Sequence, residues 1–114
     1  MKRLLQIVLL FTVAFTIAAP ILANEKSDRQ KALKLYRDGN SNEAYQAYSK
    51  LALNAKTDPK TVGADMNMAI SSLQRLNRRN ETDAFREKVI KVHAKNWRLL
   101  WTAAQSYQNA NHYG

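Results

Sequence analysis

Residues 62–76 read VGADMNMAISSLQRL, and this stretch decides the class of fold. Its apolar residues recur at steps of four, three, one, three and three, at Val62, Met66, Ala69, Ile70, Leu73 and Leu76. An α-helix has about 3.6 residues per turn, so this spacing places all six side chains in one stripe. We call residues 62–76 the central helix and expect its stripe to face the protein core. Asp65 lies just beside the stripe, which predicts a surface position for its carboxylate.

Two further helices are predicted before the central helix. Residues 28–37 and residues 44–52 both carry apolar side chains at spacings of three and four. In the turn between them, Gly39 suits the left-handed residue that ends many helices. Asn40 or Ser41 suits the N-cap of the helix that follows. The two segments are therefore expected to pair as a helical hairpin.

Turn signals also precede the helices that follow. Asp58-Pro59 predicts the N-cap and first residue of the central helix. Asn80 predicts the start of a fourth helix, which carries apolar side chains over residues 84–92. Asn96 predicts the start of a fifth helix that includes residues 97–107. No stretch alternates with the period of two that strands require, so the sequence predicts an all-α fold of about five antiparallel helices.

The predicted hairpin is repeated at an interval of 40 residues. The aligned pairs are Leu33 and Leu73, Tyr36 and Leu76, Asn40 and Asn80, Ala44 and Ala84, and Tyr45 and Phe85. One hairpin cannot bury its apolar face alone, so the two copies are expected to stack and share a core. The expected core residues are Tyr48, Met66, Ile70, Leu73, Phe85 and Val89.

The first copy resembles a known repeat. Residues 39–48, GNSNEAYQAY, are similar to the turn and second helix of a tetratricopeptide repeat, and Asp58-Pro59 resembles the proline region that closes it. The resemblance covers residues 28–59. The repeat of that family is shorter, at about 34 residues, and the second copy here has Arg79 and Lys88 at the glycine and second aromatic positions. The resemblance implies a short right-handed α-solenoid that acts as a scaffold for protein–protein interaction.

The beginning of the chain has the pattern of a secretory signal peptide. A positive start, Lys2-Arg3, precedes the uncharged residues 4–19, and Pro20 is expected to break the helix. We therefore predict a cleaved signal peptide over residues 1–23 and an exported domain over residues 24–114, in the periplasm or outside the cell. Retention of the first segment as an N-terminal membrane anchor is the alternative.

Composition argues against most catalytic and metal-binding classes. The chain of 114 residues has no cysteine, which excludes disulfides and thiolate metal sites, and its two histidines, His93 and His112, lack the spacing of metal ligands. No serine lies in a Gly-x-Ser-x-Gly pattern, and the three glycines form no phosphate-binding loop. We expect a non-catalytic protein with no cofactor and no metal.

Large apolar side chains dominate the predicted fifth helix. Trp97, Leu100, Trp101 and Tyr107 fall on about one face, and Arg98 lies beside the first tryptophan. Three interpretations stay open. The face packs back into a closed bundle, it binds another chain or a second copy, or the chain is the N-terminal fragment of a longer protein. These five residues form the candidate partner-binding site, because aromatic residues contribute disproportionately to protein binding.

The same helix carries a second resemblance. Residues 97–107, WRLLWTAAQSY, with the closing His112-Tyr113-Gly114, are similar to a stretch near the N-terminus of large bacterial alpha-macroglobulin-like envelope proteins. In that family a helical leader precedes the macroglobulin domains, which trap proteases in the cell envelope. The resemblance implies that this chain is a leader segment, because the family's thioester needs a cysteine. Its partner is then the downstream part of the same polypeptide.

The chain is strongly basic, with 18 lysines and arginines, 9 acidic residues and a net charge of +9. Arg75, Arg78, Arg79 and Arg86 lie in its most basic stretch and are candidates for an anion-binding site. Such a patch binds anionic lipid headgroups or envelope polysaccharides by releasing counterions; a solvated helix face is the simpler interpretation. No aromatic residues alternate with the basic ones, so no specific binding of nucleic acid is expected. The sequence leaves two functions open, an interaction scaffold and a cationic module for anionic polymers.

Overall fold

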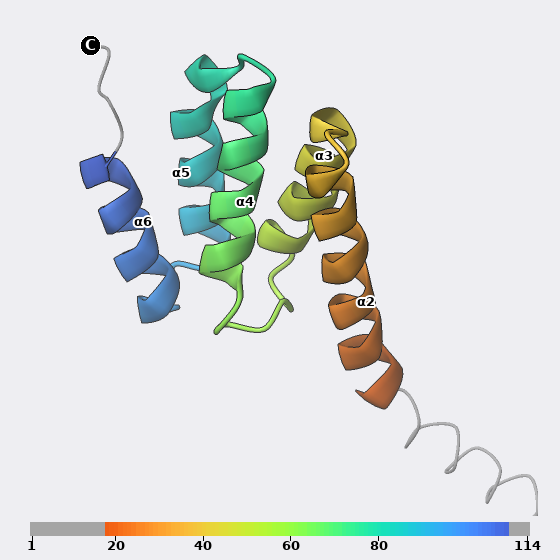
Figure 1. The fold of residues 1–114 in the computed structure, drawn as a ribbon. Helices are drawn as coiled ribbons and strands as arrows, with labels where there is room; N and C mark the ends of the chain where they lie inside the picture. The colour runs from red at the N-terminus through yellow and green to blue at the C-terminus, as the bar shows by residue number, and fades with distance from the viewer. Residues whose placement is uncertain (1–17, 110–114) are drawn as a thin grey trace, which may run out of the picture.

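The computed structural model describes residues 18–109 of the chain. Its α-helices are α2 (Ala18–Arg37), α3 (Ser41–Ala52), α4 (Val62–Arg75), α5 (Thr82–Val92) and α6 (Trp97–Asn109), and a short 3-10 helix, η1 (Arg79–Glu81), precedes α5. Successive α-helices run in opposite directions, so that α2–α3 and α4–α5 form antiparallel hairpins and α6 follows them (Figure 1). The described residues contain no strand, and the predicted all-α class is confirmed.

Helix α2 is longer than predicted. Within the described residues it runs without interruption from Ala18 through Pro20 and through the predicted cleavage position after Ala23. The expectation that Pro20 breaks the helix is therefore wrong, because Pro20 lies within the uninterrupted helix α2. Most of the predicted signal peptide, residues 1–17, lies outside the described residues. Within residues 18–109, no helix combines the length and apolar character needed to cross a bilayer.

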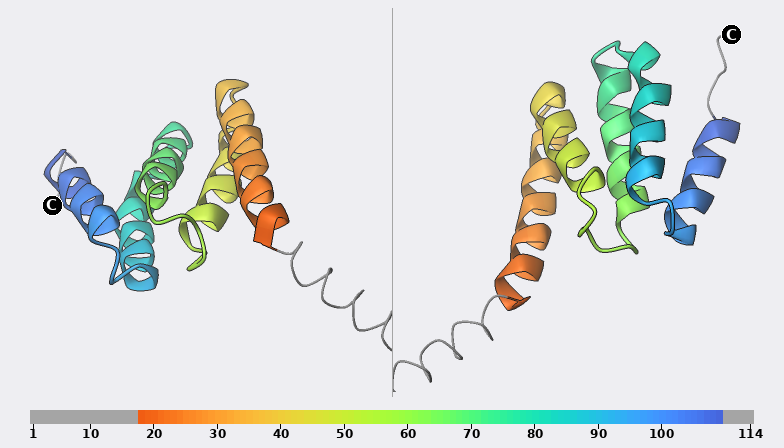
Figure 2. Two further views of the ribbon diagram at one scale, coloured as in Figure 1. Left: turned by 90° about the horizontal axis from the view of Figure 1, so that it is seen from below. Right: turned by 180° about the vertical axis from the view of Figure 1, so that it is seen from behind.

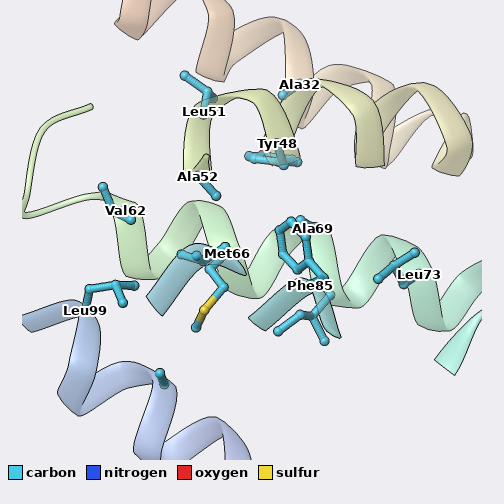
Figure 3. Close-up of a cluster of buried hydrophobic side chains, with 13 residues drawn as sticks. Ala32, Tyr48, Leu51, Ala52, Val62, Met66, Ala69, Leu73, Phe85 and Leu99 are labelled. Carbon is cyan, nitrogen blue, oxygen red and sulfur yellow. The ribbon is translucent and has the colours of Figure 1, made fainter. Parts of the chain in front are cut away.

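Helix α4 is at the centre of the fold, as its apolar stripe predicts. Val62, Met66, Ala69 and Leu73 have no exposed surface. Side chains of α3 cover one side of α4 and Leu99 of α6 covers another (Figure 3). All six residues expected in the core are buried: Tyr48, Met66, Ile70, Leu73, Phe85 and Val89. The periodicity of the sequence therefore identified the buried faces of α3, α4 and α5.

Helix α2 ends in the left-handed turn that Gly39 predicts. Gly39 has φ = +84°, and its backbone N–H donates to the carbonyl of Tyr36 at 3.2 Å. The N–H of Asn40 donates to the carbonyl of Leu35 at 2.9 Å. These two bonds are the pair that defines a Schellman motif, in which a residue of positive φ reverses the chain and satisfies the last helical carbonyls.

Helix α4 ends in the same motif, built on an asparagine. Asn77 has φ = +58°, its N–H donates to Gln74, and the N–H of Arg78 donates to the carbonyl of Leu73 at 2.9 Å. Asparagine tolerates positive φ better than other non-glycine residues. The two helix ends, at Gly39 and Asn77, are thus equivalent, although the second turn lacks glycine.

The interval of the repeat is not constant. The equivalent turn residues Gly39 and Asn77 are 38 positions apart, whereas the first residues of α3 and α5, Ser41 and Thr82, are 41 positions apart. The three residues of η1 account for the difference. The predicted alignment of Ala44 with Ala84 is therefore out of register: Ala44 is buried, but Ala84 is exposed.

Two predicted helix starts are also displaced by a few residues. Asn80 lies inside η1 rather than at an N-cap, and α5 begins at Thr82. Helix α4 begins at Val62, three residues after Pro59, because Asp58 supports a turn instead of a helix start. Its Oδ1 accepts the N–H of Lys60 at 3.0 Å. Side chains of aspartate often form such local turns with the backbone two residues ahead.

The expected surface position of Asp65 is wrong. Its side chain is 1% exposed and forms an ion pair with Arg29 of α2, with an Nη2–Oδ2 distance of 2.7 Å. A charged group can be buried at the edge of a helix stripe when a neighbouring helix supplies its counter-charge. The pairing residue is 36 positions away in the sequence, so the spacing within α4 carries no sign of it.

Candidate interaction surface on α6

Helix α6 begins where Asn96 predicts. The Asn96 Oδ1 accepts the backbone N–H groups of Arg98 and Leu99, at 3.2 and 3.3 Å, as an N-cap side chain does. The amide Nδ2 of Asn96 donates to the carbonyl of Pro59 at 3.0 Å. Asn96 therefore both starts α6 and holds its first turn against the loop between α3 and α4.

A close approach between α4 and α6 sets which side of α6 is buried. Leu99 has no exposed surface and Ala103 is 2% exposed. A Cβ atom added to Gly63 of α4 would lie 2.8 Å from Thr102 Oγ1 and 3.1 Å from Thr102 Cβ. The close approach of Gly63 to Thr102 brings this part of α6 against α4, and Leu99 and Ala103 lie on the buried side.

The other end of α6 is fixed by Arg86 of α5. Arg86 is 1% exposed; its Nε and Nη2 donate to Ser106 Oγ at 3.1 and 2.9 Å, and its Nη1 donates to Asp83 Oδ1 at 2.8 Å. Its Cζ lies 4.2 Å from the centre of the Tyr107 ring. The guanidinium is therefore fully engaged within the protein and binds α6 to α5.

The opposite side of α6 is apolar and exposed. Trp97 is 69% exposed, Trp101 63% and Leu100 37%. The first two lie one helical turn apart, on the same side of α6, and Ala104 continues that side. We call Trp97, Leu100, Trp101 and Ala104 the outer face of α6. Four of the five predicted partner-binding residues, Trp97, Arg98, Leu100 and Trp101, are exposed, whereas Tyr107 is half-buried beneath Arg86.

The sequence of α6 contains a second apolar row, which the sequence-based prediction did not use because the larger residues Trp97 and Trp101 dominate the helix. Leu99 and Ala103, four residues apart, form this row on the side of α6 opposite Trp97 and Trp101. A helix with apolar residues on two sides has two faces to cover. The structure covers the smaller row with α4 and leaves the larger row outside.

An open groove adjoins the outer face at the N-terminal end of α6. It has a volume of about 610 Å³ and forms where the loop between α3 and α4 meets the loop between α5 and α6. Its lining residues are Ala55, Thr57, Pro59, Lys91, Val92, His93, Ala94, Lys95, Asn96, Trp97 and Arg98. Among these there are three cationic side chains and no carboxylate. We call it the basic groove.

Two contacts shape the basic groove. The Arg98 Cζ lies 5.1 Å from the centre of a Trp97 ring, which places a cation against the exposed indole. His93 is 7% exposed, and its Nε2 lies 2.8 Å from the carbonyl oxygen of Ala52. His93 therefore connects the end of α5 to the end of α3 and forms the inner wall of the groove.

The four candidate anion-binding arginines do not form one surface. Arg75 donates to the Tyr36 carbonyl at 2.8 Å, with its Cζ 3.6 Å from the Tyr36 ring, and Arg86 is buried against α6. Arg78 forms two hydrogen bonds with Glu81, which raise the pKa of Arg78 and lower the pKa of Glu81 from their usual values. Arg79 is exposed.

The described residues contain no group of three or more histidine, cysteine, aspartate and glutamate side chains that could hold a metal ion. The candidate functional site of the described chain is the outer face of α6 together with the adjoining basic groove. A scan against protein-family models and searches of curated proteins and of solved structures find no match to the chain.

Proposed function

We propose that the protein is a non-catalytic helical-hairpin scaffold that binds a partner protein through the outer face of α6. The observation that carries this proposal is the exposure of Trp97 and Trp101, 69% and 63%, one turn apart on the same side of one helix. Removing a large apolar side chain from water is worth about 1.5–3 kcal/mol. Two neighbouring indoles left in water therefore offer a strong driving force for association.

The arrangement of the rest of the chain supports a scaffold. The hairpins α2–α3 and α4–α5 bury a shared core along α4, and their equivalent Schellman turns favour the tetratricopeptide-like solenoid that the sequence suggests. Helices α2 and α6 lie at opposite ends of the array (Figure 2), and the outer face of α6 is exposed. A terminal helix with a free apolar side is suited to end-on binding of another protein.

Site-specific photocrosslinking in the producing cell tests this proposal. A photoreactive amino acid at position 101 is expected to form an adduct with one identifiable protein, and Trp97→Ser is expected to abolish that adduct. The matched control carries the photoreactive group at Gln46, which is exposed on α3. Adducts that are the same from both positions, or that contain no second protein, contradict the proposal.

We also propose that the scaffold is exported. The positive start and the uncharged residues 4–19 support this, and cleavage after Ala23 would retain the tertiary contacts that α2 makes from Glu25 onward. Sequencing of the mature N-terminus is expected to give Asn24. An intact Met1 in the membrane fraction supports the anchored alternative, and an intact Met1 in the cytoplasm contradicts export.

The two other functions have less support. The leader-segment proposal assigns the same outer face of α6 to a downstream part of the polypeptide. The cationic-module proposal is weakened because two of its four arginines are already engaged. Arg86 is buried, and Arg78 forms an ion pair with Glu81. Binding that falls steeply with rising salt and does not require Trp97 or Trp101 would favour the cationic module.

A further inference from the structure

The described helices alternate in direction, and α6 breaks the pairing. Helix α2 is paired with α3 and helix α4 with α5, whereas the outer face of α6 has no helix against it within residues 18–109 (Figure 1). The outer face has the spacing of a helix-pairing stripe, because Trp97, Leu100, Trp101 and Ala104 follow steps of three, one and three. Helix α6 therefore has the geometry of the first helix of a third hairpin.

The charged residues beside the outer face indicate the charge of the partner that binds there. Lys91, Lys95 and Arg98 line the basic groove at the N-terminal end of α6, and no carboxylate lines it among the described residues. Arg98 is the single charged residue of α6 itself. A second copy of this chain is a poor occupant, because each copy remains strongly basic after the proposed cleavage removes Lys2 and Arg3, with 16 of the 18 basic residues left against 9 acidic residues. An acidic partner complements the groove.

The direction of the occupant follows from the position of the cations. A helix antiparallel to α6 places its C-terminal end beside the N-terminal end of α6, next to the basic groove. The C-terminal end of a helix has a partial negative charge, which nearby cations stabilise. An antiparallel helix with acidic residues in its last turns therefore satisfies both the apolar stripe and the three cations.

We infer that the outer face of α6 binds an acidic amphipathic helix of a partner protein, antiparallel to α6, as the second helix of a third hairpin. This inference rests on the proposed function and adds the class, charge and direction of the partner. The apolar residues of the partner helix cover Trp97, Leu100 and Trp101. Its carboxylates lie against Lys91, Lys95 and Arg98.

Four dye-labelled synthetic peptides of equal length test the inference against the purified protein by fluorescence anisotropy. The first is an amphipathic helix with glutamates in its last two turns, and the second has the same glutamates in its first two turns. The third replaces them by lysine, and the fourth carries two prolines that prevent helix formation. The first peptide is expected to bind at least about tenfold more tightly than each of the others.

Matched protein variants locate the peptide. Lys91→Glu with Lys95→Glu is expected to weaken the first peptide about tenfold. Lys34→Glu with Lys50→Glu changes the net charge equally at exposed positions on α2 and α3, and is expected to change binding less than about twofold. A short-range nitroxide quencher on the C-terminal end of the peptide is expected to quench Trp97 and Trp101 more than one on the N-terminal end.

The outcomes separate the inference from the proposed function. Three results would contradict an acidic antiparallel helix as the occupant: equal binding of all four peptides, stronger quenching from the N-terminal label, or equal losses of affinity in the two charge variants. None of them contradicts the proposal that the outer face of α6 binds a protein. Binding that Trp101→Ala does not weaken overturns both. A purified protein that is already dimeric, with both indoles protected from acrylamide, assigns the face to a second copy and overturns the inference.

Discussion

The carboxylate of Asp65 on α4 accepts two hydrogen bonds from the guanidinium of Arg29 on α2, with Oδ1–Nε and Oδ2–Nη2 distances of 2.8 and 2.7 Å. Arg29 Nη2 also donates to Glu25 Oε1 and Thr61 Oγ1, both at 2.9 Å. The two bonds to Asp65, and then the bond to Glu25, raise the pKa of Arg29 above its usual value. Two helices of different hairpins are thereby joined by a largely buried charge network.

The two partners of this pair are not equivalent, and their substitutions are expected to differ. Arg29→Met leaves a carboxylate that is 1% exposed without its counter-charge, at a cost of about 3–5 kcal/mol. Asp65→Asn leaves a guanidinium that is 26% exposed and still paired with Glu25, so the expected cost is about 1–3 kcal/mol. Urea unfolding followed by circular dichroism measures both. A larger loss for Asp65→Asn contradicts the assigned burial.

The two Schellman turns predict substitutions of opposite sign. Gly39→Ala forces a β-carbon into positive φ without any new contact, since no atom lies within 4 Å of the added Cβ, and is expected to cost about 1–2 kcal/mol. Asn77→Gly relieves the same strain and is expected to stabilise the protein by a few tenths of a kcal/mol, up to about 1. Thermal unfolding midpoints that shift in the same direction would show that the turns differ.

The assignment of the two sides of α6 predicts unequal costs of truncation. Leu99→Ala removes a fully buried side chain and is expected to lower the free energy of unfolding by about 2–5 kcal/mol. Trp101→Ala removes a larger but mostly exposed side chain, so its effect is expected to stay within about 0.5 kcal/mol. Chemical denaturation of the monomer checks both variants. A large loss for Trp101→Ala would place the indole in the core.

The contact between α4 and α6 predicts a coupled pair. Gly63→Ala brings a Cβ atom to 2.8 Å from Thr102 Oγ1, which forces the helices apart, and is expected to cost about 1–3 kcal/mol. Thr102→Ala removes that oxygen but leaves a Cβ at 3.1 Å, so it should restore part of the loss. The double-mutant cycle therefore has a favourable coupling energy. Purely additive effects would mean that the two residues do not touch.

The buried phenol of Tyr48 predicts a loss of stability in alkali. Burial raises the pKa of Tyr48 above its usual value of 10.0, and the side chain is 3% exposed. The unfolded chain ionises first, so this contribution to stability is complete below pH 10 and is lost as the pH rises through the folded pKa. Tyr48→Phe is expected to flatten the alkaline fall in unfolding free energy and to have little effect at neutral pH. Parallel pH profiles would contradict this.

The sequence predicted the helices and the core because both depend on local periodicity. Met66 and Phe85 were placed in the core from the spacing of their neighbours, and Gly39 was placed in its turn from its own freedom of φ. Asp65 and Arg86 were misplaced as surface charges because their partners, Arg29 and Ser106, lie 36 and 20 positions away. Contacts between side chains so far apart in the sequence leave no trace in the periodicity of a single helix.

The large apolar residues of α6 were predicted as a candidate site, but the sequence did not show which side of the helix is exposed. Trp97 and Leu99 are both apolar, and which one is buried depends on how α6 packs against α4, a helix distant in the sequence. The basic groove was missed for a similar reason. It forms where Pro59 and Lys95, from two separate loops, come together in the folded chain.

The most extensive helix contact in the fold lies between α3 and α4, which belong to different hairpins. In repeat arrays the interfaces between neighbouring units couple their folding, so the two hairpins are expected to unfold together. A chain cut in the loop over residues 53–61 divides the core that the hairpins share, and neither piece is expected to fold alone. The two pieces together contain every core element, so fragment complementation should restore the fold in a reaction whose rate depends on the concentration of both.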